Sequence, residues 1–226
     1  MPFVRERYRE LLMGAKDQHG WCSDIPREHK DKPVLSIVRN PYDSYVSAYT
    51  FGWWKKDFAN QVPNGQDGYF QDAEAVKQKY PEAPNWEFPQ FLAASWEFSL
   101  WVRRTLDTHP DAANLGMYTH RFVYFYCRDH DYVFDAAHDP KRFLERVKEC
   151  LYDVHFLRQE NLNQGLHEFL QTMGYSREHL EFMLQKEKIN VSRKDTSFNK
   201  FYSDGLKQEV RKKDAIIFEL FPEYDD

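Results

Sequence analysis

The chain of 226 residues has few cysteines, no excess of positive charge and no long apolar run. Cys22, Cys127 and Cys150 are widely spaced and odd in number, which argues against a disulfide framework and favours a reducing compartment. No apolar run approaches the ~20 residues that span a bilayer. Residues 1–7 lack the apolar core of a signal peptide. We therefore expect a soluble, cytoplasmic protein with no membrane partner.

The charge balance excludes a second class of partner. Lys and Arg total 31 and Asp and Glu total 36, a formal net charge of −5. General nucleic-acid binding needs a basic field, so we expect no nucleic-acid partner. The charge is unevenly spread, because residues 186–213 contain nine Lys or Arg and four Asp or Glu, 9 − 4 = +5. A local basic pocket for a small anion therefore remains open.

Aromatic residues are abundant, at 17% of the chain, which predicts a buried core rather than disorder. The length suits a single domain, 1–226. Helical spacing alternates with short apolar runs at 34–38 and 152–157, the first without alternation and thus typical of a strand buried on both faces. This order predicts an α/β fold with a parallel sheet flanked by helices and a largely helical C-terminal half. The turn-rich residues 57–87 predict a long loop or lid insertion.

The most informative segment is VLSIVRNPYDSYVSAY, residues 34–49. Asn40 can cap the following helix, and Pro41 fits its first turn. Arg39 then lies at the carboxyl end of a strand, where open parallel sheets bind ligands. Ser47 lies two helical turns beyond Asn40, so a guanidinium and a hydroxyl on one side could grip a phosphate. Alternatively, Arg39 pairs with an acidic neighbour and Ser47 merely faces a small gap. That interpretation would be favoured for an isolated Arg and Ser, so the prediction of a phosphate site depends on the whole string.

The string Val38-Arg39-Asn40-Pro41-Tyr42-Asp43, followed by Val46-Ser47-Ala48-Tyr49, resembles the 3′-phosphate-binding segment of sulfotransferases of the bacterial and carbohydrate type. The late stretch 153–162 and the terminal Phe221-Pro222-Glu223-Tyr224 are also similar. The resemblance implies a P-loop nucleotide-hydrolase-like fold. It implies that 3′-phosphoadenosine 5′-phosphosulfate is the co-substrate, that Arg39 and Ser47 hold its 3′-phosphate, and that no metal is required. The acceptor would be a hydroxyl of a carbohydrate or small molecule.

Three further site residues follow from the resemblance. His19 lies twenty residues before Arg39, where many sulfotransferases have a general base, and Glu28 and His29 are fallback candidates. Arg193 and Lys194 occupy the place of a late Arg-Lys-Gly loop that closes over the 3′-phosphate, although Asp195 replaces the glycine. Alternatively, His19 is a partly exposed loop residue, and Arg193 and Lys194 belong to a solvated polar turn. His19-x-x-Cys22 and Cys127-x-x-His130 could supply metal ligands, but chance pairing is the favoured interpretation.

One element of the family pattern is missing. Sulfotransferases begin with a strand and a loop like Pro-Lys-x-Gly-Thr-Thr that holds the 5′-phosphosulfate, and no such loop occurs in this sequence. Either the true start lies upstream or the element has been lost. The first hypothesis is thus a sulfotransferase. The second is a catalytically degenerate relative that binds the nucleotide or a glycan, and the third, a small-molecule P-loop kinase, lacks its Walker lysine.

Overall fold

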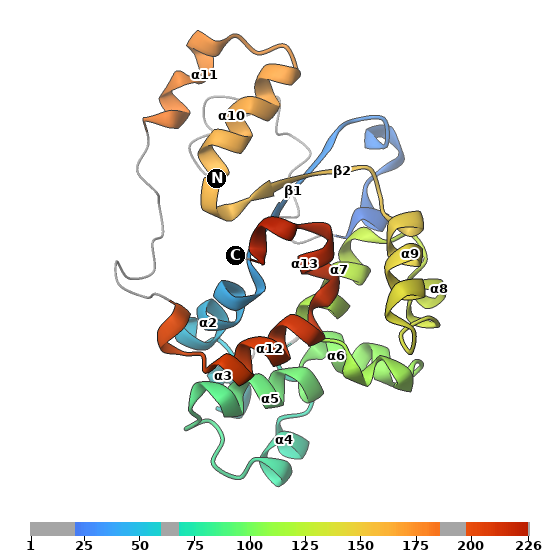
Figure 1. The fold of residues 1–226 in the computed structure, drawn as a ribbon, viewed down its shortest axis with the longest axis vertical. Coiled ribbons are helices and arrows are strands. Elements are labelled where there is room, and N and C mark those ends of the chain that lie inside the picture. Colours follow the sequence, from blue (N-terminus) through green and yellow to red (C-terminus); the bar gives the residue numbers. More distant parts are fainter. Residues whose placement is uncertain (1–20, 60–67, 186–197, 226) are drawn as a thin grey trace.

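The computed structural model describes residues 21–59, 68–185 and 198–225 (Figure 1). Its sheet has two parallel strands in that part of the chain, β1 (Val34–Val38) and β2 (Val154–Arg158). Val34 pairs with Val154 and Val38 with Arg158, so both strands end at one edge. The prediction of an α/β fold with a parallel sheet and a largely helical C-terminal half is confirmed at this level.

Twelve α-helices surround the two strands in the described ranges. They are α2 (Pro41–Phe51), α3 (Lys55–Phe58), α4 (Ala73–Lys79), α5 (Phe88–Phe98), α6 (Leu100–Leu106), α7 (Met117–Tyr126), α8 (His130–Phe134), α9 (Pro140–Cys150), α10 (Leu162–Thr172), α11 (Arg177–Leu184), α12 (Asp204–Lys213) and α13 (Ala215–Leu220). Short 3-10 turns include η2 (Arg27–His29), η4 (Gln159–Asn161) and η6 (Pro222–Tyr224).

The sheet separates a small helical layer from a large one. In Figure 1, α10 and α11 lie on one side of the strands and the remaining helices on the other. Alternation along β2 explains this, because neighbouring side chains on a strand point to opposite faces. Leu157 packs with Leu166 and Leu180 in the small layer, whereas Phe156 contacts Phe122 in the large one.

The helix that follows β1, α2, begins where the sequence predicts. The Asn40 side chain accepts a 2.9 Å hydrogen bond from the Tyr42 N–H, and Pro41 occupies the first turn. Gly52 ends α2 with a φ of 70°, a left-handed conformation that glycine adopts without a steric penalty. These local signals hold Arg39 at the junction between strand and helix.

The described residues of 57–87 depart from the predicted loop or lid. They include α4, and Phe70, Val76 and Trp86 are buried in the main aromatic core. The Trp86 ring stacks on that of Trp54 with centroids 5.2 Å apart and planes at 10°. Burial of these large side chains anchors the described part of the segment to the body of the protein. Residues 60–67 of the turn-rich stretch lie outside the described residues.

Helical spacing over 88–101 and 203–221 predicts two continuous helices, and the structure interrupts both. One strand is also less buried than expected. Ser99 has an extended backbone and forms a β-bridge with Phe70, which separates α5 from α6. Asp214 separates α12 from α13. Ile37 on β1 is 41% exposed, so the prediction of a strand buried on both faces is wrong at this position. Its exposed side chain lines the pocket described next.

Candidate functional site

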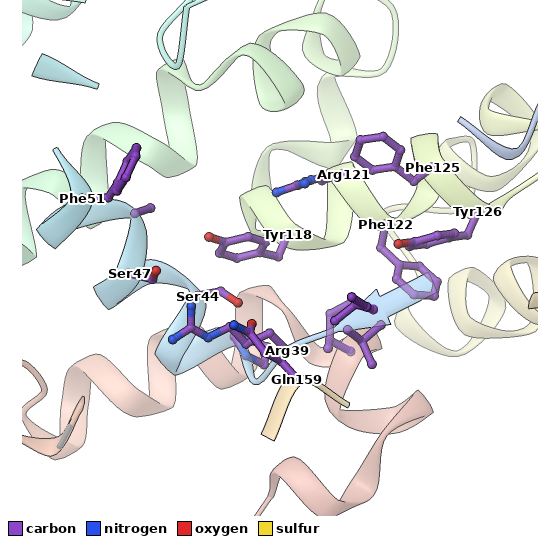
Figure 2. A pocket seen from close by; sticks show the side chains of 15 residues that line it. Arg39, Ser44, Ser47, Phe51, Tyr118, Arg121, Phe122, Phe125, Tyr126 and Gln159 are labelled. Atoms are coloured by element: carbon purple, nitrogen blue, oxygen red, sulfur yellow. The ribbon is translucent and has the colours of Figure 1, made fainter. Parts of the chain in front are cut away.

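A pocket of about 380 Å³ lies at the carboxyl end of β1, between α2 and α7 (Figure 2). Ligand sites of open parallel sheets occur at this edge. Its lining includes no Asp, Glu or His among the described residues. The lining residues are Ile37, Val38, Arg39, Pro41, Ser44, Ser47, Ala48, Phe51, Tyr118, Arg121, Phe122, Phe125, Tyr126, Gln159 and Ile217.

One wall is a single face of α2. Ser44, Ser47 and Phe51 follow one another at helical spacing, so their side chains form a stripe along the pocket. Arg39 precedes the stripe at the end of β1. Figure 2 shows Arg39, Ser44 and Ser47 on the same side of the cavity. The structure thus brings together Arg39 and Ser47, the two nucleotide-binding residues that the resemblance implies in this part of the chain.

The opposite wall is α7, where Tyr118, Arg121 and Phe125 line the pocket. The Arg121 guanidinium lies 5.1 Å from the centroid of the Phe125 ring. Arg121 does not stand out in the sequence, because residues 118–126 are too rich in aromatics to distinguish helix from strand. Its spacing from Tyr118 and Phe125 would have been the signal once the segment was known to be a helix.

The two arginines of the pocket have no carboxylate bound to them in the part of the chain that the structure describes. Within the described ranges, neither Arg39 nor Arg121 forms an ion pair within 4.0 Å. Burial raises the pKa of Asp43, and the nearby Arg39 only partly offsets this. Glu160 accepts a 3.2 Å hydrogen bond from the Asn40 N–H. Two guanidiniums therefore face a cavity whose described lining supplies no counter-charge.

The phenols of the pocket remain protonated at neutral pH. Burial raises the pKa of Tyr118 to about 12, although the charge of the nearby Arg121 lowers it. Burial also raises the pKa of Tyr126, whose hydroxyl lies 2.7 Å from the Ser36 hydroxyl. Together with the guanidiniums and serines, these groups make the pocket a set of hydrogen-bond donors suited to an anion.

Of the other predicted site residues, the structure describes only Glu28 and His29. Glu28 and His29 lie in η2, and neither is among the lining residues. His19, Arg193 and Lys194 lie outside the described residues. In the described ranges, no group of three or more His, Cys, Asp or Glu side chains could hold a metal ion. Likewise, none of the helices described is long and apolar enough to cross a membrane.

A second cavity of about 430 Å³ lies between β2, α10 and Phe221. It differs from the first in its charge, because Arg158 in its lining forms an ion pair of 3.4 Å with Glu223. An arginine that already has a carboxylate partner is a weaker anion ligand. The first pocket is therefore the candidate site.

Comparisons of the chain with protein-family models, with curated proteins and with solved structures found no match. The functional argument therefore rests on the residues themselves.

Proposed function

We propose that the pocket between α2 and α7 binds 3′-phosphoadenosine 5′-phosphosulfate. We propose further that the protein transfers the sulfuryl group to a hydroxyl of a carbohydrate or small-molecule acceptor. The observation that supports this most directly is that Arg39, at the end of β1, and Ser47, on α2, line one pocket whose described lining contains no acid. These are the residues to which the sulfotransferase-like string assigns the 3′-phosphate. A P-loop nucleotide-hydrolase-like arrangement of the parallel sheet is part of the proposal.

The chemistry of the pocket fits this ligand. Arg39 offers a planar fork of N–H donors that matches phosphate oxygens, and the Ser47 hydroxyl lies on the same wall. The rings of Phe51 and Phe125 offer apolar surfaces on which the flat, uncharged part of a nucleotide or acceptor can pack. In the transfer, the acceptor oxygen attacks sulfur and the bond from sulfur to the bridging oxygen of the 5′-phosphate breaks. The products are the sulfate ester and adenosine 3′,5′-bisphosphate, and the hydroxyl proton passes to a base.

A second candidate function is nucleotide binding without transfer. It is favoured by the lining, which among the described residues offers no His, Asp or Glu to accept a proton. Tyr118 does not serve as a base at neutral pH, because a pKa of about 12 keeps its phenol protonated. His19 is the proposed base from the resemblance. Binding and transfer are therefore tested separately.

Binding is tested by thermal unfolding with adenosine 3′,5′-bisphosphate or 5′-AMP. A ligand at 100 times its Kd adds about 2.7 kcal/mol, and for a chain of this size each kcal/mol raises Tm by roughly 2–4 °C. We expect a larger shift for the bisphosphate, and loss of most of that shift in Arg39→Ala. Arg177→Ala is the control, since Arg177 is exposed on α11. Equal shifts for the two nucleotides, or an unchanged shift in Arg39→Ala, would contradict the proposal.

Transfer is tested with donor labelled in its sulfuryl group and a panel of hydroxyl acceptors. A sulfotransferase yields labelled sulfate ester in amounts equal to the bisphosphate released, and His19→Ala reduces this yield. Binding of the bisphosphate with no labelled product from any acceptor would favour the second candidate.

A further inference from the structure

Arg121 is a charged residue of the described pocket lining to which the proposed function assigns no role. It reaches the cavity from α7, on the wall opposite Ser47, and Figure 2 shows Tyr118 on the same wall. We infer that Arg121 binds the second anionic group of the ligand, the 5′-phosphosulfate, while Arg39 binds the 3′-phosphate. This inference rests on the proposed function, because it assigns the two ends of the same ligand to two walls of the same pocket.

The two positive charges in the pocket support this assignment. Arg39 and Arg121 carry like charges in one cavity, and no carboxylate among the described lining residues separates or neutralises them. Both act on the same side chain, because each lowers the pKa of Tyr118 against the larger effect of burial. A single phosphate matches the fork of one guanidinium. A ligand with anionic groups at two ends of a ribose offsets both charges.

Three other arginines that lie over aromatic rings provide a comparison. Arg128 stacks on Tyr152 and donates to the Leu151 carbonyl at 2.6 Å. Arg146 stacks on Tyr132 and donates to its carbonyl. Arg211 stacks on Phe218 and donates to Asp225 at 2.6 Å. In each case the guanidinium lies over an aromatic ring, and an oxygen atom accepts a hydrogen bond from its N–H groups.

Arg121 also lies over an aromatic ring, but no described residue accepts a hydrogen bond from its guanidinium. Its guanidinium lies 5.1 Å from the Phe125 centroid, and within the described residues it has neither a hydrogen-bond acceptor nor an ion pair. A purely structural arginine would resemble the three above. The Phe125 ring restricts the guanidinium at the cavity wall, so less conformational freedom is lost when an anion binds.

The experiment measures Kd by calorimetry for adenosine 3′,5′-bisphosphate and for 3′-AMP, which lacks the 5′-phosphate. The proteins are the wild type, Arg121→Gln, Arg39→Gln and the exposed control Arg177→Gln. Loss of one charged contact weakens binding roughly ten- to a hundredfold. We expect Arg121→Gln to weaken the bisphosphate by this factor and to change 3′-AMP by less than about threefold. Arg39→Gln weakens both ligands, and Arg177→Gln weakens neither.

The outcomes separate this inference from the proposed function. If the wild type binds neither nucleotide, the proposed function fails and the inference fails with it. If the wild type binds the bisphosphate but Arg121→Gln binds it equally well, or loses both nucleotides equally, only the inference is overturned. Should Arg121→Gln not fold, Arg121→Lys replaces it. The ammonium keeps the charge but not the planar fork, so a weaker loss is expected, again for the bisphosphate alone.

Discussion

The phenolic hydroxyl of Tyr45 on α2 donates a 2.7 Å hydrogen bond to Oδ2 of Asp214, the residue between α12 and α13. Both side chains are fully buried. Oδ1 of Asp214 accepts a 2.8 Å bond from the Thr119 N–H on α7, and Trp96 Nε1 donates to the Tyr45 oxygen at 2.9 Å. One carboxyl group thus connects α2 with α7, the two helices that form the walls of the pocket.

The stability of this connection depends on pH. Burial raises the pKa of Asp214 from 3.8 to about 6, although hydrogen bonds from Tyr45 and Thr119 and the charge of Lys213 lower it. The folded protein therefore holds the proton more tightly than the unfolded chain. The resulting stabilisation is fully present below about pH 3.8 and is lost as the pH rises through about 6. The shift corresponds to about 3 kcal/mol.

The measurement is urea unfolding of the wild type and of Asp214→Asn between pH 4 and pH 7. The variant cannot titrate at this position, whereas the other carboxyl groups are common to both proteins. We expect the wild type's free energy of unfolding, relative to that of the variant, to fall as the pH rises. A difference that stays constant across the range would show that Asp214 has an ordinary pKa.

Tyr45→Phe removes the phenol that links Asp214 to Trp96. Both partners are buried, so each would lose a hydrogen bond without gaining water, at about 1–3 kcal/mol per unsatisfied group. Tyr132→Phe is a matched control, because the Tyr132 hydroxyl bonds to Glu149 at an exposed position. We expect denaturant unfolding to show a clear loss in the first variant and less than about 1 kcal/mol in the second. Equal losses would contradict the role given to Tyr45.

Gly116→Ala tests how closely the backbone approaches the same carboxyl group. A Cβ at this position would lie 2.4 Å from the Asp214 carboxyl atoms, which hydrogen bonds from Tyr45 and Thr119 hold in place. Relief of this overlap would shift the carboxyl group or α7, so we expect a loss of about 1–3 kcal/mol.

Gly205→Ala provides the contrast in α12. A Cβ there meets nothing within 4 Å, and alanine favours the helix over glycine by up to about 1 kcal/mol. Thermal unfolding should therefore move in opposite directions for the two substitutions. A lower Tm for both variants would mean that contact with Asp214 is not the reason for the cost at Gly116.

Ser47→Ala tests the hydroxyl predicted to hold the 3′-phosphate. Within the described residues its side chain makes no hydrogen bond, so its removal should leave the Tm of the free protein almost unchanged. Loss of a hydrogen bond to a charged group costs about 1.5 kcal/mol or more, roughly tenfold in Kd for adenosine 3′,5′-bisphosphate. Calorimetry checks this, with the exposed Ser23→Ala as control. Unaltered affinity in Ser47→Ala would remove Ser47 from the site.

The part of the site on β1 and α2 could be predicted from sequence because its signals are local. Asn40 and Pro41 start α2, Gly52 ends it, and the helical repeat places Ser44 and Ser47 on one face. The capping of α9 by Asp139, which accepts from the Lys141 and Arg142 N–H groups, was predictable for the same reason. Where residues close in sequence decide the structure, hydrogen bonds to nearby backbone groups are sufficient.

The interruptions of the predicted helices had a different cause. Ser99 leaves the helical conformation because Phe70, distant in sequence, bridges to it, and the Leu100 N–H bonds to the Tyr69 carbonyl at 3.0 Å. The apolar spacing on either side continues as if the helix were unbroken. A helix can thus be interrupted by contacts with residues distant in sequence, and the apolar spacing of the helix itself does not reveal such contacts.

The sequence by itself determined the class of this protein: an α/β chain with a parallel sheet, and an Arg-Asn-Pro element whose Arg39 and Ser47 suit a phosphate. Only the tertiary structure decided that α7 forms the opposite wall, that Arg121 joins Arg39 there, and that the described lining contains no acid. The physical reason is that charge complementarity depends on which side chains meet in space. Helical packing around the buried Asp214, rather than any local pattern, brings α2 and α7 together.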